Sequence, residues 1–445
     1  MNKQIIFGFI MLFAFGARAT DVFGVYHPQQ AACDHIDFSK KMDLGAIMEA
    51  ALCQNPALKI SYLSTQISSA EYGASFSDYL PQISLESTLG HETRKQDAGS
   101  SNDAGTLSAG ANLSWLLLDF GSREASRQKM KAFLESADFS YNNTLQGILY
   151  DVSDAYYSLL SAQEKHEGLL KSEEASKKAY EEASSRYQLG LVPLSDKLQA
   201  ETAYAQAQLA SIVAAKQIKL QQGNMAELLH VQPSTSFSLV RPSKTISDKS
   251  NLASFEKLVQ TALKNRPDLR AIEKEQKAAE ENIRILRSEG LPTLTAVASS
   301  GLSDDIRGNN RNTYSGSVGL RLSFPLFTGF SQSYKEGRAR FQYEQKTTEL
   351  TALQNTIQNE VWTALQDYQT SLKTHTISKT LLKSAEESER VAFASYKVGK
   401  LNITSLLDAQ SQLASARIEY STSFYNFLIS KAALLRALGN MEKEK

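Results

Sequence analysis

Few residue patterns in this chain have the types and spacing that chemistry requires. The sequence contains no G-x-S-x-G nucleophile elbow, no phosphate-binding P-loop and no H-E-x-x-H zinc motif. Its only two cysteines are Cys33 and Cys53. His27 and His35 flank Cys33, but their spacing matches no standard zinc site. The carboxylates are spread along the chain without converging. We therefore predict no enzymatic activity, no cofactor and no bound metal.

The first nineteen residues have the pattern of an export signal. Lys3 gives a positive start, and residues 5–15 form an apolar stretch too short to span a membrane as a helix. Residues 17–19 read Ala-Arg-Ala and fit a cleavage site. We predict a signal peptide over residues 1–19, so the mature chain lies outside the cytoplasm.

The predicted compartment assigns a role to the two cysteines. An oxidising space favours a disulfide between two cysteines that lie close in sequence. A bond between Cys33 and Cys53 closes a loop of roughly 20 residues and contributes about 3 kcal/mol in the chain-entropy account. Two free thiols are the alternative, which this compartment disfavours.

The charge balance excludes one class of partner. The chain has 48 Lys and Arg residues against 48 Asp and Glu residues. Nucleic-acid-binding proteins concentrate basic residues to neutralise phosphates, so we predict no nucleic-acid partner. After the N-terminus, the longest helical stretches are rich in Lys, Glu and Gln, and no segment reads as a transmembrane helix. If this protein meets a membrane, it must do so with strands.

The chain is a tandem repeat. Its second copy follows the first by 211 residues at the start and by 209 residues further on. The clearest matches are Leu80-Pro81 with Leu291-Pro292, Leu113-Ser114-Trp115 with Leu322-Ser323-Phe324, and Tyr187 to Gly190 with Tyr396 to Gly399. Such a period marks a duplicated unit. We predict repeat 1 over residues 20–229, a linker over residues 230–253 and repeat 2 over residues 254–445.

Each repeat has the same predicted order of elements. A first helix runs from about Asp43 to Tyr79 in repeat 1 and from about Ser254 to Gly290 in repeat 2, and a proline ends it. A β-hairpin, a very long helix, a tight glycine-containing turn and a further helix follow. The predicted bounds are 82–115, 122–189 and 194–229 in repeat 1, and 293–324, 331–398 and 403–438 in repeat 2.

The very long helix has no use in an ordinary globular domain. Residues 122–189 contain no proline, and at 1.5 Å per residue they span roughly 100 Å. Their apolar residues Leu145, Leu149, Val152, Tyr156 and Leu159 step by four and three, the spacing of a coiled-coil seam. The following helix is rich in Ala and Ser, which let neighbouring helices approach closely. This pattern predicts packed rods.

The hairpin strands alternate apolar and polar residues, as in Ile83, Leu85 and Leu89 against Ser84 and Glu86. Each strand has about the ten residues that a tilted membrane strand needs. Four strands cannot close a barrel, and lipid does not tolerate an open sheet edge. We predict an α+β membrane protein. Three copies give four strands each to a twelve-stranded outer-membrane β-barrel, and the long antiparallel coiled-coil helices form a periplasmic α-barrel.

Six segments resemble the TolC family of outer-membrane efflux and type I secretion proteins, and the likeness covers about Asp43 to Gly439. The segments are residues 51–56 (Ala-Leu-Cys-Gln-Asn-Pro), 78–84, 186–196, 326–330, 395–402 and 406–410. Each motif alone is weak, but their order, duplication and spacing are specific. The resemblance implies a homotrimeric channel in the outer membrane, with a tube that extends into the periplasm.

The resemblance also implies partners and site residues. The glycine turns become periplasmic tips where a membrane-fusion adaptor docks, at Leu189, Gly190, Leu191, Val398, Gly399 and Lys400. An inner-membrane ABC or proton-driven transporter supplies the energy. The residues that match the family's gate pattern are Ser195, Asp196, Tyr396 and Asp408, whereas Leu401 and Ser405 replace a gate arginine and a lumen acid.

The gate pattern also has a physical interpretation. A hydrogen bond from the Tyr396 hydroxyl to Asp196 would be charge-assisted and would contribute about 1.5–3 kcal/mol if it were sheltered from water. Such a latch is weak enough for a docking partner to break.

Several alternatives stay open. A structural coiled-coil stalk would share the long helices, but would not need paired amphipathic hairpins. A secreted enzyme on a helical scaffold lacks any motivating cluster of residues. Trp115, Phe324 and Tyr79 near the strand ends form an interfacial aromatic belt, or pack where barrel and tube meet. Within the transport interpretation, the sequence does not separate drug efflux from type I protein secretion.

Overall fold

The computed structural model describes residues 24, 38, 40–95, 101–243, 254–305 and 313–441. The predicted signal peptide, His27, Cys33 and His35 lie outside these residues. The chain divides into two compact units. Of the described residues, unit 1 contains 24, 63–95, 101–138, 271–305 and 313–349, and unit 2 contains 38, 40–62, 139–243, 254–270 and 350–441. Each unit therefore takes segments from both sequence repeats.

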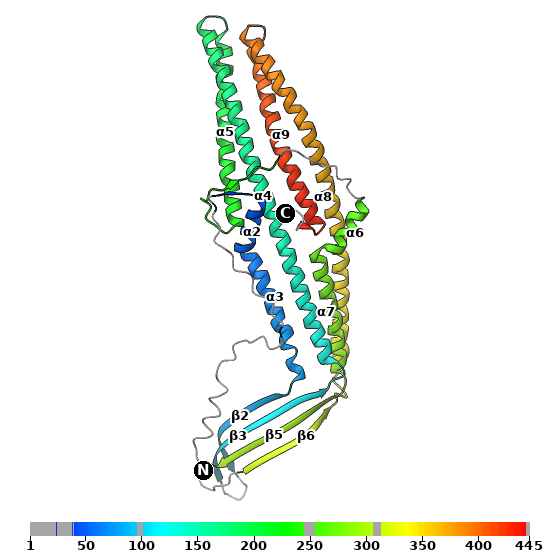
Figure 1. The fold of residues 1–445 in the computed structure, drawn as a ribbon. Coiled ribbons are helices and arrows are strands. Elements are labelled where there is room, and N and C mark those ends of the chain that lie inside the picture. The colour runs from blue at the N-terminus through cyan, green and yellow to red at the C-terminus, as the bar shows by residue number, and fades with distance from the viewer. Residues whose placement is uncertain are drawn as a thin grey trace. The chain divides into compact units, whose positions relative to one another are not determined.

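Unit 1 is built around one antiparallel sheet (Figure 1). Strands β2 (Gln82–Lys95) and β3 (Ser101–Leu118) form the first hairpin, and β5 (Thr293–Asp305) and β6 (Thr313–Ser323) form the second. The strand order is β2-β3-β5-β6, so β3 and β5 join the two repeats. β2 and β6 are the edges of the sheet.

The first helix of each repeat is broken, which corrects our prediction of one continuous helix. Repeat 1 has α2 (Leu44–Gln54), α3 (Pro56–Ala74) and a short 3-10 turn, η1 (Ser77–Tyr79). Repeat 2 has α6 (Phe255–Asn265) and α7 (Pro267–Glu289). Asn55 and Arg266 have extended backbones, because a residue before proline avoids the helical region. Proline then begins the next helix, where its missing N–H is not needed.

The long helices of the two repeats match in length. Helices α4 (Ser122–Gln188) and α8 (Ser331–Lys397) have 67 residues each, whereas α5 (Leu194–Leu228) and α9 (Ile403–Ala437) have 35 each. This equality supports the tandem repeat. Among the residues described, no helix combines the length and the apolar character needed to cross a membrane.

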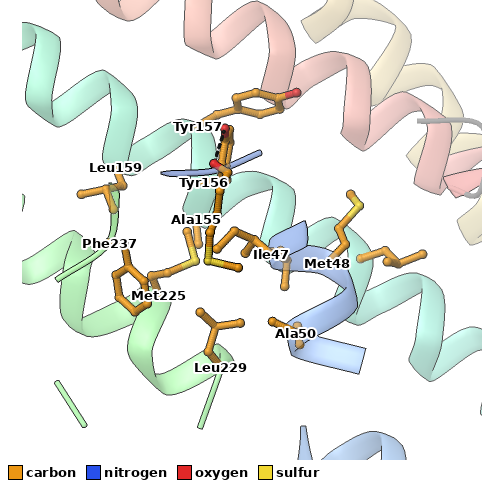
Figure 2. Packing of buried hydrophobic residues seen from close by; sticks show 14 of the residues in the cluster. Ile47, Met48, Ala50, Ala155, Tyr156, Tyr157, Leu159, Met225, Leu229 and Phe237 are labelled. Carbon is orange, nitrogen blue, oxygen red and sulfur yellow. Dashed lines mark hydrogen bonds between the residues drawn. The ribbon is translucent and has the colours of Figure 1, made fainter. Parts of the chain in front are cut away.

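The largest core of unit 2 contains the predicted coiled-coil seam. Leu149, Val152, Tyr156 and Leu159 of α4 are buried there, with Leu145 packed against them. Figure 2 shows α2, α4 and α5 contributing side chains to this core, together with Phe237. A second core holds the matching α8 residues Val361, Leu365 and Tyr368. Burial of these apolar stripes explains why such polar helices pack side by side.

The described part of the linker between the repeats is tied to this core. Strand β4 (Ser238–Leu239) pairs in parallel with β1 (Lys41–Met42). The hydroxyl of Tyr156 donates to the carbonyl oxygen of Val240 at 2.5 Å, and Arg241 forms an ion pair with Glu167. These contacts hold the linker against α4 as far as Arg241.

Candidate functional site

The sheet of unit 1 has one apolar face. In the observed register, Leu85 of β2 lies opposite Ala111 of β3, which lies opposite Ser300 of β5. Side chains in one such row share a face, and the alternation then assigns every other residue. The apolar face therefore carries Ile83, Leu85, Leu89, Leu113, Trp115, Ala298, Leu302, Tyr314, Val318, Leu320 and Leu322. Val318 is 90% exposed, so no described residue covers this face at β6.

The opposite face of the sheet is polar. It carries Ser84, Glu86, Thr88, Asn112, Ser114, Ser299, Ser317 and Arg321. The hydroxyl groups of Ser299 and Ser317 lie 2.8 Å apart across β5 and β6. A sheet with one apolar and one hydrated face, and with two unpaired edges, suits a boundary between lipid and water.

A hydrogen-bonded corner joins the sheet to α4. The guanidinium group of Arg123 donates to the carbonyl oxygens of Leu116 at 2.6 Å and Leu117 at 3.2 Å, and pairs with Asp119 at 3.1 Å. Its carbon lies 5.0 Å from the centre of the Tyr79 ring. Arg123 was not predicted from the sequence, although its four-residue spacing from Asp119 at a helix start is a usable signal.

The same corner holds two of the aromatic residues that we considered for a membrane belt. The indole nitrogen of Trp115 donates to the carbonyl oxygen of Tyr79 at 3.0 Å, and the Tyr79 hydroxyl donates to Glu124 at 2.9 Å. Hydrogen bonds from Arg127 and Gln128 lower the pKa of Glu124 to about 2. These contacts favour the packing interpretation for Tyr79, whereas Trp115 and Phe324 are also exposed, so the membrane-belt interpretation stays open for both.

The two predicted tips have the same turn geometry. Gly190 and Gly399 adopt positive φ values of 71° and 76°. The Leu191 N–H donates to the Arg186 carbonyl oxygen, and the Lys400 N–H donates to the Ser395 carbonyl oxygen, both at 2.9 Å. This pattern ends a helix with a left-handed glycine. The turns place Leu189, Leu191 and Val398 at the surface, with exposed fractions of 74%, 64% and 68%.

Arg186 connects the two tips, and our sequence analysis gave it no role. Its guanidinium group donates to the carbonyl oxygen of Tyr396 at 2.5 Å and stacks 5.1 Å from the centre of that ring. A Cβ added to Gly399 would lie 3.2 Å from its Nη2 atom. The equivalent position of repeat 2 is Ser395, so this contact occurs once per chain. The difference between Arg186 and Ser395 at equivalent positions was the sequence signal that could have identified Arg186.

The structure does not contain the predicted hydrogen bond between Tyr396 and Asp196. Tyr396 is 2% exposed, and its hydroxyl has no hydrogen-bond partner among the described residues. Burial raises the pKa of Tyr396, the Arg186 charge opposes this rise, and the Asp196 charge adds to it. Asp196 is therefore close enough to act on the ring, but it accepts from Ser195 at 3.3 Å. Stacking on Arg186 and packing in a small apolar cluster orient the ring instead.

The remaining gate positions lie near the tips without direct bonds to this group. Asp408 is exposed on α9, and within the described chain no hydrogen bond or ion pair joins it to Ser195, Asp196 or Tyr396. Leu401, in place of the family's arginine, packs against the cluster that contains Tyr396. The side-chain oxygen of Asn402 caps α9 by accepting a hydrogen bond from the Ser405 N–H at 2.9 Å.

The predicted disulfide lies only partly within the described residues. Cys53 of α2 is disulfide-bonded, and its pairing with Cys33 stays a prediction because Cys33 lies outside the described residues. Across residues 40–95, 101–243, 254–305 and 313–441, no group of three His, Cys, Asp or Glu side chains is placed to hold a metal ion.

The chain matches the outer membrane efflux protein family over residues 47–229 and 258–440. These two matches fall on the two repeats and together cover most of the sequence, so the chain belongs to this family. It is an outer-membrane channel protein of efflux and type I secretion systems and not an enzyme. The predicted family, TolC-like fold, channel function and outer-membrane location are thereby confirmed.

Individual relatives extend over nearly the same length. Protein CyaE of Bordetella pertussis is 26% identical over 406 residues, covering 90% of this chain and 85% of that protein. Outer membrane protein TolC of Vibrio cholerae is 25% identical over 387 residues, covering 83% and 84%. The crystal structure of the Campylobacter jejuni CmeC outer membrane channel superposes with a TM-score of 0.79 at 17% identity, covering 89% of this chain and 86% of that one. This last likeness concerns the fold.

Proposed function

We propose that three copies of this chain close a twelve-stranded barrel in the outer membrane and form one gated conduit. The observation that carries the proposal is the four-stranded sheet, which has an uncovered apolar face and two free edges. In lipid, every backbone hydrogen-bonding group needs a partner, so the free edges of β2 and β6 must be paired. Three copies with four strands each give a barrel wide enough for a lumen.

The helical tips are the proposed docking site for a periplasmic membrane-fusion adaptor. Leu189, Leu191 and Val398 are large apolar residues held at the surface by rigid left-handed turns. Exposed apolar side chains on a fixed backbone lose little conformational entropy on binding. The adaptor connects the conduit to an inner-membrane ABC or proton-driven transporter, which supplies efflux or type I secretion substrates.

The gate is proposed at Ser195, Asp196, Tyr396 and Asp408, close to the docking tips. The unpartnered Tyr396 hydroxyl supports a gate with more than one state, because a buried hydroxyl without a hydrogen bond is energetically unfavourable. A conformation that gives this hydroxyl a hydrogen-bond partner avoids this unfavourable energy. An adaptor that binds one conformation more tightly shifts the population toward it.

Conductance across a lipid bilayer tests the conduit. The purified, detergent-extracted protein is reconstituted into planar bilayers or liposomes, and single-channel currents are recorded. A trimeric pore gives discrete, uniform current steps, whereas a protein that only coats the membrane gives none. Trimeric protein without discrete steps, in either the wild type or the gate variant below, contradicts the proposal.

The same recordings test the gate. The double variant Tyr396→Phe with Asp196→Ala removes both proposed gate groups and is expected to raise the single-channel conductance. Glu49→Gln, which alters an exposed carboxylate on α2, serves as a control of similar chemistry far along the chain. Conductance equal to that of the wild type in the double variant excludes these two residues from the gate.

A further inference from the structure

We assign to the membrane the part of the sheet nearest the helix ends, which contains only two charged residues. Across residues 82–90, 106–118, 293–303 and 313–323 these are Glu86 on β2 and Arg321 on β6. They have opposite charge, and the register places both on the polar face. They also lie on the two edge strands, one on each.

Neither charge has a partner among the described residues. Both side chains are exposed, and neither forms an ion pair or hydrogen bond with another described residue. They cannot pair with each other, because Glu86 shares its row with Ser315, six residues from Arg321, and three strand spacings of about 4.8 Å separate the edges.

We propose that Arg321 of one copy forms an ion pair with Glu86 of the next copy, across a seam where β6 pairs with β2. The pair lies on the polar, lumen side of the barrel and recurs at each of the three seams. This inference rests on the proposed trimer and adds the register and the partner residues of its interface.

The stagger of the strands within one chain predicts this register. The row that starts at Gln82, the first residue of β2, reaches β6 at Gly319, four residues before the last residue Ser323. From β2 to β6, three strands along the sheet, a row of paired residues thus shifts by four residues relative to the first residue of β2 and the last residue of β6. We call this shift the rise. If the register shifts at the same rate across the seam to β2 of the next copy, the total rise over four strands is about five residues.

A rise of five residues is excluded, because side chains alternate between the two faces of the sheet. Only an even offset keeps the polar faces of neighbouring copies on the same side, so the rise is four or six residues. Followed across the sheet of its own chain, the row that contains Arg321 meets the edge of β2 at the level of residue 80. A rise of six places it opposite Glu86 of the next copy, and a rise of four places it opposite Ser84, with Glu86 at the diagonal. Long side chains bridge both positions.

The geometry of the closed barrel agrees with these offsets. Rises of four and six residues per copy correspond to strand tilts of roughly 35° and 45° in a twelve-stranded barrel, within the range that barrels adopt. The pair also selects the correct edges. Pairing β2 with β2, or β6 with β6, brings like charges together, which destabilises a cross-strand contact. Opposite charges on the two edges therefore favour head-to-tail ring closure over an open dimer.

Cysteine cross-linking tests the proposed seam in the full-length protein. The variant Glu86→Cys with Arg321→Cys is expected to form covalent dimers and trimers on a non-reducing denaturing gel, which a reductant dissolves. The matched control is Leu85→Cys with Arg321→Cys, whose cysteines lie on opposite faces of the sheet. Each cysteine alone provides a second control. Equal cross-linking in the control overturns the proposed register, and the absence of cross-linking at Glu86 overturns the rise of six residues.

Charge reversal tests the ion pair independently of cross-linking. Glu86→Arg and Arg321→Glu each place like charges at the seam and are expected to speed heat-induced trimer dissociation by at least about threefold. The double exchange is expected to restore the wild-type rate. Single variants that dissociate at the wild-type rate, or a double variant no slower than the singles, contradict the pair.

Light scattering on the wild-type protein separates the two proposals. A trimer whose Glu86 and Arg321 variants behave like the controls leaves the conduit intact and removes the ion pair. A wild-type protein that is not trimeric in detergent or membranes removes both.

Discussion

Gly439 and His230 occupy equivalent positions at the C-terminal ends of α9 and α5, 209 residues apart. Both have left-handed backbones, with φ values of 70° and 54°. Their surroundings differ, because a Cβ added to Gly439 would lie 3.0 Å from the backbone N and Cα of Arg266. His230 is exposed. In repeat 2, the turn at Gly439 is thus constrained both by its positive φ and by the nearby backbone. In repeat 1, the turn at His230 is constrained by φ alone.

We expect Gly439→Ala to destabilise unit 2 by about 1–3 kcal/mol, because it adds left-handed strain and overlap with rigid backbone. The matched variant His230→Gly is expected to change stability by less than about 1 kcal/mol, since relief of strain offsets the greater freedom of glycine in the unfolded chain. Urea unfolding followed by far-UV circular dichroism measures both. Equal effects of the two variants would show that the contact with Arg266 has no energetic weight.

At the residue scale, the sequence predicted positions better than contacts. The tip glycines were recognisable because a left-handed turn strongly prefers glycine at a helix end. Tyr396 and Asp196 were also placed near each other, but their hydrogen bond is absent. Its presence depends on how Arg186 orients the Tyr396 ring, and the helical period does not contain that information.

The long helices were the most predictable elements. Residues 122–189 have no proline and a regular seam, and the observed α4 ends one residue before the predicted boundary. The break between α2 and α3 was missed, although Asn55-Pro56 lies in the sequence. A proline is compatible with the first turn of a helix, so it marks either a boundary or a start, and the pattern alone does not distinguish them.

Helix α4 also contains a carboxyl group, that of Asp154, which lowers the stability of the folded chain. Burial raises the pKa of Asp154, and the charge of Asp151 one turn away raises it further. A carboxyl group with a raised folded-state pKa binds its proton more tightly in the folded chain than in the unfolded chain. Its contribution to folding is therefore zero at low pH, where both states are protonated, and unfavourable once both states are ionised.

Asp154→Asn is expected to stabilise unit 2 at pH 7 by up to about 1 kcal/mol, because it removes a charge that is unfavourable in the folded state. The gain should shrink as the pH falls and vanish below about pH 4, where the unfolded-state carboxyl group is protonated as well. Urea midpoints across this pH range measure the effect, with Glu49→Gln as the exposed control. A gain that persists at low pH would assign the effect to something other than charge.

On the scale of the whole chain, the repeats are units of sequence but not of packing. Strands β3 and β5 pair across the two repeats, and Arg186 of repeat 1 holds Tyr396 of repeat 2. Each compact unit is assembled from both halves. A period of 209 residues reveals the duplication, but it does not reveal which duplicated parts contact each other. The need for further copies did follow from the sequence, because four amphipathic strands are too few to close a barrel.

Amide hydrogen exchange on the assembled protein in detergent tests whether the sheet closes. If β6 of each copy pairs with β2 of the next, no strand is an edge, and the amides of β2 and β6 should be as protected as those of β3 and β5. In an open sheet, about half of the amides on β2 and β6 have no partner and exchange quickly. Rapid exchange along one face of both edge strands, in a sample shown to be trimeric, would mean that the copies associate through their helices and leave the sheets unpaired.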